Sequence, residues 1–125
     1  MGDVSNSSNH EISATQTDWR VNVEFNGVTI ADSSKSILLR EGSMAPVYYF
    51  PRDDVRMDLM RRSRHKTHCP FKGDASYWCL TVGEKSLRNV VWSYENPIEE
   101  VVSIKSFVAF YMEQLGATYV EDTQS

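Results

Sequence analysis

A strict alternation of apolar and polar residues, which ends at an Asn-Gly pair, limits the folds open to this chain. Every second residue is apolar from Trp19 to Phe25, a period typical of a half-buried strand. Asn26 and Gly27 follow, and this pair favours the positive φ angles of a two-residue hairpin turn. Because the apolar run resumes at Val28, the sequence predicts an antiparallel hairpin.

Further short apolar runs are separated by turn residues, so they are also expected to be strands. These segments are 37–39, 47–50, 75–82, 87–94, 107–111 and 117–120, the last two as a closing pair. Asp53 is expected to cap a short helix over 53–60, and Asn96 with Pro97 to begin another over 97–104. The pattern predicts a mainly β, antiparallel sandwich or open barrel, with one or two short helices, rather than a βαβ fold.

Domain boundaries follow from the distribution of apolar residues. Residues 1–18 are rich in Ser, Asn and Thr and lack hydrophobic periodicity, so they are predicted to be a disordered tail. Residues 19–121 are expected to form a single domain, followed by a C-terminal tail over 122–125. No apolar stretch approaches the ~20 residues that cross a bilayer, and no secretory signal is recognised. We therefore expect a cytoplasmic protein without a membrane partner, whose oligomeric state stays open.

Positive charge is concentrated in one segment of an acidic chain. Residues 52–72 hold seven Lys or Arg and three Asp, a balance of +4, whereas the whole chain carries a net charge of −4. The acidic remainder would repel an extended nucleic acid backbone, so this segment suits a small anion better than nucleic acid. A solvated charged face is the alternative explanation.

The densest run of chemically versatile side chains is 67–78, which combines a thiol, an ammonium, a glycine and several aromatic rings. Together with four other motifs it resembles the domain of unknown function 427 family over roughly residues 19–120. The motifs are 31–33, 48–55, 67 with 69–77, Trp92 with Tyr94 and Pro97, and 108–111. The resemblance implies a β-tent-like fold, in which two antiparallel sheets packed at an angle enclose a cavity. The family also carries a nucleotidyltransferase-like name.

Amphipathic aromatic residues are more numerous than a core of this size needs, so some are expected to line a cavity. Strand alternation sends Tyr77 and Trp78 to opposite faces and puts Trp92 and Tyr94 on the same face. Aromatic walls with a few polar groups are typical of small-ligand pockets. We expect a site for a small anionic or carbonyl-containing ligand, without a cofactor, formed by Tyr49, Arg52, Cys69, Lys72, Gly73, Tyr77, Trp92 and Tyr94.

Two cations are the candidate anchors for that ligand. Lys72 places an ammonium beside Gly73, where the backbone can approach a ligand closely. Arg52 offers a planar fork that suits a carboxylate or a phosphate. The alternative explanation is that Gly73 only makes a turn and Lys72 points to solvent.

Two catalytic hypotheses stay open beside ligand binding. Two cations, Lys72 and either Arg52 or Lys66, would favour the thiolate of Cys69 if they are close in space, which makes Cys69 the candidate catalytic nucleophile. Its alternative role is that of a small buried side chain. A nucleotidyltransferase reaction would instead use Asp53, Asp54 and Glu41 to hold Mg²⁺. Adjacent carboxylates on a strand point to opposite faces, however, and helix capping explains Asp53 and Asp54 better.

Structural zinc is not predicted. The chain has two cysteines, Cys69 and Cys79, together with His65 and His68 in the same region. Zinc sites of this kind usually pair their ligands at short regular spacings, and these residues match no such pair. We therefore expect no metal site.

Overall fold

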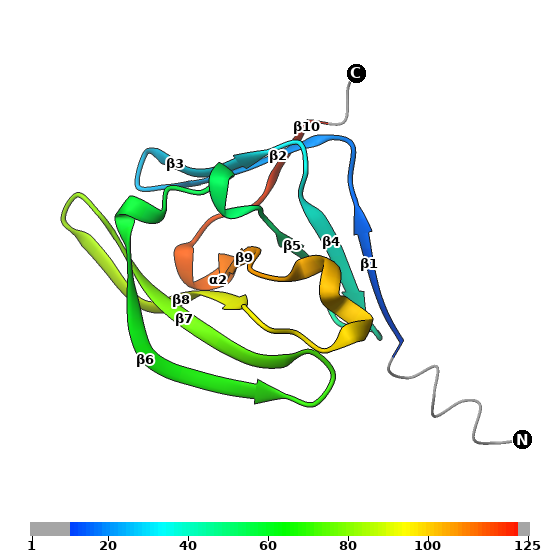
Figure 1. The fold of residues 1–125 in the computed structure, drawn as a ribbon. Helices are drawn as coiled ribbons and strands as arrows, with labels where there is room; N and C mark the ends of the chain where they lie inside the picture. Colours follow the sequence, from blue (N-terminus) through cyan, green and yellow to red (C-terminus); the bar gives the residue numbers. More distant parts are fainter. Residues whose placement is uncertain (1–10, 123–125) are drawn as a thin grey trace, which may run out of the picture.

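The computed structural model describes residues 11–122 and shows a mainly β fold (Figure 1). The strands are β1 (Ile12–Gln16), β2 (Arg20–Phe25), β3 (Val28–Ser33), β4 (Ile37–Glu41), β5 (Val47–Tyr49), β6 (Met60–Cys69), β7 (Gly73–Val82), β8 (Lys85–Tyr94), β9 (Val108–Phe110) and β10 (Val120–Asp122). The helical segments are short: η1 (Arg52–Asp54), η2 (Met57–Leu59), η3 (Glu99–Ile104) and α2 (Met112–Leu115). None of the described helices is long and apolar enough to span a membrane.

The strands form three antiparallel sheets, where two were expected. Their orders are β1-β4-β5, β10-β2-β3 and β6-β7-β8-β9. A β-bridge between Phe50 and Val108 joins the first sheet to the third, with both backbone N–H···O distances at 2.8 Å. Figure 1 shows β2 and β3 along the top, β1 and β4 on the right, and the long strands β6 to β8 on the lower left. The expectation of a mainly β fold with few helices is confirmed.

The predicted hairpin is present, and the expected strands 75–82 and 87–94 form a second one. Asn26 and Gly27 have φ angles of 52° and 81°, as a two-residue turn with positive φ at both positions requires. β2 then pairs with β3 through Phe25 and Val28. The second hairpin joins β7 to β8, and Val82 pairs with Lys85 beside its turn.

The predicted disordered tail was wrong for its second half, because residues 12–16 form β1. This strand pairs with β4, and Ala14 lies opposite Leu39. Thr17, which follows the strand, is buried and its hydroxyl lies 2.9 Å from that of Ser36. This strand was not expected, because only two of its five side chains, Ile12 and Ala14, are apolar. Residues 1–10 of the predicted tail lie outside the described residues.

The C-terminal boundary and the closing strand pair also need correction. Asp122, assigned to a tail, ends β10 and pairs with Arg20 of β2. β9 pairs with β8 instead of β10. α2 separates these two strands, and its C-cap Gly116 has a φ of 65°. Residues 123–125 lie outside the described residues.

The segment from 53 to 60 was expected to be one helix capped by Asp53. The structure has two 3₁₀ turns there instead, and the N-cap of the first is Pro51 without a side-chain hydrogen bond. Strand β6 then begins at Met60. This strand was not expected, because its polar and charged side chains show no apolar alternation. Its position at the edge of the sheet explains that composition.

Each face of the β6–β9 sheet covers a different hydrophobic core. The larger core contains Trp78 and Leu80 and packs against Val21, Val23 and Ile30 of the β2–β3 hairpin. The smaller core contains Tyr77 and Tyr94 and lies against β4, Tyr49 and η3. Tyr77 and Trp78 therefore point to opposite faces, as alternation predicted.

Candidate functional site

A pocket of about 630 Å³ opens between the β1-β4-β5 sheet and the β6–β9 sheet. Its walls come from the ends of β4 and β5, the middle of β7, the C-terminal end of β8, and α2 with the residues before it. The lining includes five of the eight predicted ligand-binding residues: Tyr49, Lys72, Tyr77, Trp92 and Tyr94. The apolar or aromatic side chains Leu39, Met44, Val47, Phe110, Tyr111, Met112 and Tyr119 also line it.

Aromatic rings hold one another in place along the pocket wall. The indole of Trp92 meets the ring of Tyr49 edge to face, with centroids 6.2 Å apart, and Trp92 Nε1 donates to the Tyr49 hydroxyl at 3.1 Å. The ring of Tyr111 covers Trp92 at a centroid distance of 4.5 Å. Tyr49 is almost fully buried, whereas 37% of Tyr111 is exposed. The aromatic wall thus extends from the buried ring of Tyr49 to the partly exposed ring of Tyr111.

Tyr77 belongs to a second group of rings on the same wall. Its ring is stacked nearly parallel to that of Tyr111, with centroids 6.5 Å apart. The Tyr77 hydroxyl lies 2.9 Å from the hydroxyl of Thr67, on the neighbouring strand β6. The ring of His65 packs edge on against Tyr77 at 4.5 Å. These contacts fix the orientation of Tyr77 toward the pocket.

Lys72 reaches the pocket from the turn between β6 and β7, and its ammonium forms a buried ion pair with Glu41 at the end of β4. The two residues are only 9% and 7% exposed. Lys72 Nζ also lies 6.0 Å from the centre of the Tyr94 ring. Lys72 thus lies at the pocket and does not point to solvent. The Glu41 carboxylate neutralises the charge of Lys72.

Burial extends the pH range over which phenols of this pocket stay protonated. It raises the pKa of Tyr49 and of Tyr94 far above the ordinary value of 10. Burial also raises the pKa of Tyr111, to about 12, and its hydrogen bond with Tyr77 adds to the shift. At neutral pH these hydroxyls are neutral donors, which suits them to bind an acceptor on a ligand.

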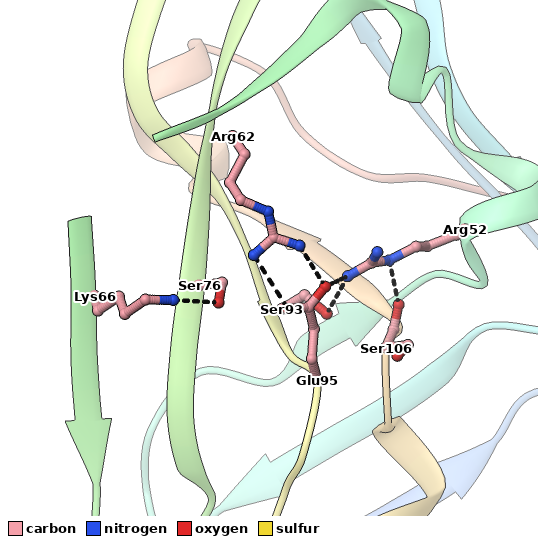
Figure 2. Close-up of polar contacts among 7 residues, drawn as sticks. All are labelled: Arg52, Arg62, Lys66, Ser76, Ser93, Glu95 and Ser106. Atoms are coloured by element: carbon pink, nitrogen blue, oxygen red, sulfur yellow. Dashed lines mark hydrogen bonds and ion pairs between the residues drawn. The ribbon is translucent and has the colours of Figure 1, made fainter. Parts of the chain in front are cut away.

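Arg52 lies away from the pocket, on the opposite face of the β6–β9 sheet. Its Nε donates to the backbone oxygen of Ser106 at 2.8 Å, and its Nη2 donates to Glu95 at 2.7 Å (Figure 2). Its guanidinium also lies over the Trp78 ring, 5.0 Å from the centroid. Arg52 and Lys72 therefore do not anchor the same ligand.

Cys69 and Gly73 shape the turn that carries Lys72. The backbone oxygen of Cys69 accepts a hydrogen bond from Lys72 N at 3.1 Å, and the half-buried Cys69 side chain packs against the smaller core. Gly73 has a φ of 116°, and a Cβ there would lie 3.3 Å from Asn96 O and from Pro97 Cα. Only glycine fits this position without strain.

The carboxylates invoked for nucleotidyl transfer lie at different places. Glu41 is in the aromatic pocket beside Lys72, whereas Asp53 and Asp54 line a separate depression next to Asp32 and Val55. Within the described part of the chain, no three His, Cys, Asp or Glu side chains gather where they could hold a metal ion.

The fold and the site together define a mainly β domain whose aromatic pocket lies between two antiparallel sheets. The model of the family described as Domain of unknown function (DUF427) matches residues 13–121, and the chain belongs to this family. No curated protein matches the sequence.

Sequence reasoning did not anticipate the contributions of Tyr111, Tyr119 and Met44 to the pocket, or the role of Glu41 as the partner of Lys72. Tyr111 stands in one of the motifs that carry the family resemblance, and this position is the signal that could have identified it. The pairing of Glu41 with Lys72 spans 31 residues and joins two sheets. No local pattern reports such a contact.

Proposed function

We propose that this domain binds a small planar organic ligand through a carbonyl or similar acceptor group in the pocket between the sheets. The observation that carries the proposal is the ion pair of Lys72 and Glu41 in an otherwise aromatic pocket wall. Burying two charges is costly, and apolar residues of similar volume would stabilise the fold at least as well. A ligand that uses these groups accounts for their position.

Neutralisation of Lys72 by Glu41 favours a carbonyl over an anion. The pair has no net charge, so it offers little attraction to a carboxylate or phosphate. An ammonium has three donors, however, and Glu41 occupies one of them. The Tyr94 hydroxyl is a second donor in the pocket, and it has no hydrogen-bond partner among residues 11–122. Two donors that converge on one acceptor would orient a flat molecule between the rings.

The rings determine the shape of the ligand. Trp92, Tyr77 and Tyr111 offer faces and edges over which an aromatic or conjugated ring can stack. A volume of about 630 Å³ lies within the range of small-molecule sites.

A matched set of benzene derivatives tests the proposal, with the indole signal of Trp92 in NMR spectra as the readout. Benzamide carries the carbonyl, benzoate a negative charge, and benzylamine a positive charge. We expect benzamide to shift the Trp92 signal at lower concentration than the other two. Lys72→Met should weaken benzamide binding about fivefold, the loss of roughly 1 kcal/mol for one hydrogen bond.

Lys66→Gln is the matched control, because it removes a lysine charge outside the pocket lining. It should leave benzamide binding unchanged. Equal affinity for benzamide and benzylamine, or unchanged benzamide binding in folded Lys72→Met, would contradict the proposal.

A further inference from the structure

A second polar cluster lies on the opposite face of the β6–β9 sheet from the pocket. Figure 2 shows Arg52 and Arg62 approaching Glu95 from two sides, while Lys66 extends toward Ser76 on the neighbouring strand. Arg62 donates to both carboxylate oxygens of Glu95, at 3.1 and 2.7 Å, and Lys66 Nζ donates to Ser76 Oγ at 3.1 Å. We call these five residues the arginine-lysine cluster.

An irregularity in β6 brings Arg62 and Lys66 together. Arg62 pairs with Trp78 and Lys66 pairs with Ser76, with a register shift between them. Two residues four apart in the sequence therefore lie opposite residues only two apart on β7, a separation of about 7 Å along the strand. Such bulges often redirect side chains near functional sites. Arg62 and Lys66 would share a face in a regular strand as well, and the bulge shortens the distance between them.

The geometry of the arginines is fixed by contacts that leave donors available. Both guanidinium groups lie over the Trp78 ring, at 5.0 and 4.7 Å from its centroid. Among residues 11–122, Arg62 Nε and Arg52 Nη1 donate no hydrogen bond. Lys66 has two further donors beyond its bond to Ser76. Ordered arginine forks with spare donors are well suited to tetrahedral oxyanions.

The charge balance of the arginine-lysine cluster indicates the ligand. Three cations face one carboxylate, which leaves a formal charge of +2 in a chain whose net charge is −4. A phosphate monoester carries about −1.5 to −2 charges at neutral pH, so it would compensate this excess. An extended polyanion would meet the acidic remainder of the chain.

We infer that the arginine-lysine cluster is a binding site for the phosphate group of a small phosphate monoester. Lys66 and the spare donors of Arg62 and Arg52 hold the phosphate oxygens, while Glu95 keeps the two guanidinium groups in position. The arginine-lysine cluster is separate from the pocket, so this inference does not depend on the proposed function.

The test uses NMR titration of the full chain with inorganic phosphate and with phosphoserine, against sodium chloride at equal ionic strength. We expect both phosphates to shift the backbone signals of Arg62, Lys66 and Ser76, and chloride to leave them in place. Lys66→Gln should weaken phosphate binding about fivefold, whereas Lys85→Gln, on the β7–β8 hairpin, should leave it unchanged.

Arg62→Lys is the second variant, because it keeps the charge but loses the planar fork. It should also weaken phosphate binding, while Lys72→Met in the pocket should not. Shifts of equal size with chloride, or equal affinity in Lys66→Gln and Lys85→Gln, would overturn the inference. A phosphopeptide that binds more than tenfold tighter than phosphoserine would also overturn it, in favour of a protein partner.

Discussion

The ammonium of Lys72 and the carboxylate of Glu41 form a buried ion pair that ties the turn after β6 to the end of β4. Lys72→Met leaves the Glu41 carboxylate buried without this cation, so we expect the free energy of unfolding to fall by about 3 kcal/mol. Urea denaturation of the two proteins measures the difference.

The double variant Lys72→Met with Glu41→Gln measures how far the stability effects of the two residues depend on each other. Because neither position is then charged, we expect the double variant to be more stable than Lys72→Met alone. A double variant that loses as much stability as the sum of both single variants would show that the two groups act independently.

The pH dependence of stability should report the ion pairs of Glu95 with Arg62 and Arg52. Hydrogen bonds from Arg62 and then Arg52 lower the pKa of Glu95 from 4.5 to about 2. Since this pKa is lower in the folded chain, the carboxylate stabilises the fold above about pH 4.5 and loses this effect as the pH falls toward 2.

Glu95→Gln tests whether the charge of the Glu95 carboxylate causes this pH dependence of stability. At pH 7 we expect a melting temperature about 4 °C lower than that of the unmodified chain, which corresponds to about 1 kcal/mol for a partly exposed pair. The difference should shrink between pH 4.5 and pH 2. A difference that is constant over this range would mean that the carboxylate charge is not responsible.

Gly73 should tolerate substitution poorly. Its φ of 116° and the nearby Asn96 and Pro97 backbone predict that Gly73→Ala lowers the free energy of unfolding by about 2 kcal/mol. Gly116→Ala is the matched control, because Gly116 also has a positive φ, 65°, but an added Cβ meets nothing within 4 Å. Thermal unfolding should therefore rank Gly116→Ala as the milder change; the reverse order would contradict the close approach seen at Gly73.

Tyr111 should affect ligand binding more than stability. It is 37% exposed, yet its ring covers Trp92 and stacks beside Tyr77 in the pocket. We expect Tyr111→Ala to change the free energy of unfolding by about 1 kcal/mol or less and to weaken benzamide binding severalfold. NMR titration and urea denaturation of the same sample check both statements; Tyr111→Phe should retain binding.

Sequence patterns predicted the parts of the fold that depend on local information. The Asn26-Gly27 turn and the opposite orientations of Tyr77 and Trp78 follow from backbone conformation and strand period alone. β1 and β6 were missed because edge strands bury little apolar surface and so lack the alternation that reveals a strand.

The site was predictable in its aromatic residues but not in its polar contacts. Alternation placed Trp92 and Tyr94 on the face that lines the pocket. Arg52 and Lys72 are 20 positions apart and have similar chemistry, yet they lie on opposite faces of a sheet. Which partner each cation finds, Glu95 or Glu41, depends on how the three sheets pack. That arrangement is a property of the whole chain.

The separation of the two hydrophobic cores by a single sheet has a consequence for variation in this domain. Val21 and Leu80 of the larger core do not line the pocket, whereas Phe110 belongs to this core and lines the pocket as well. Substitutions at Val21 and Leu80 should therefore change stability and leave the pocket wall in place, but a substitution of Phe110 should change both.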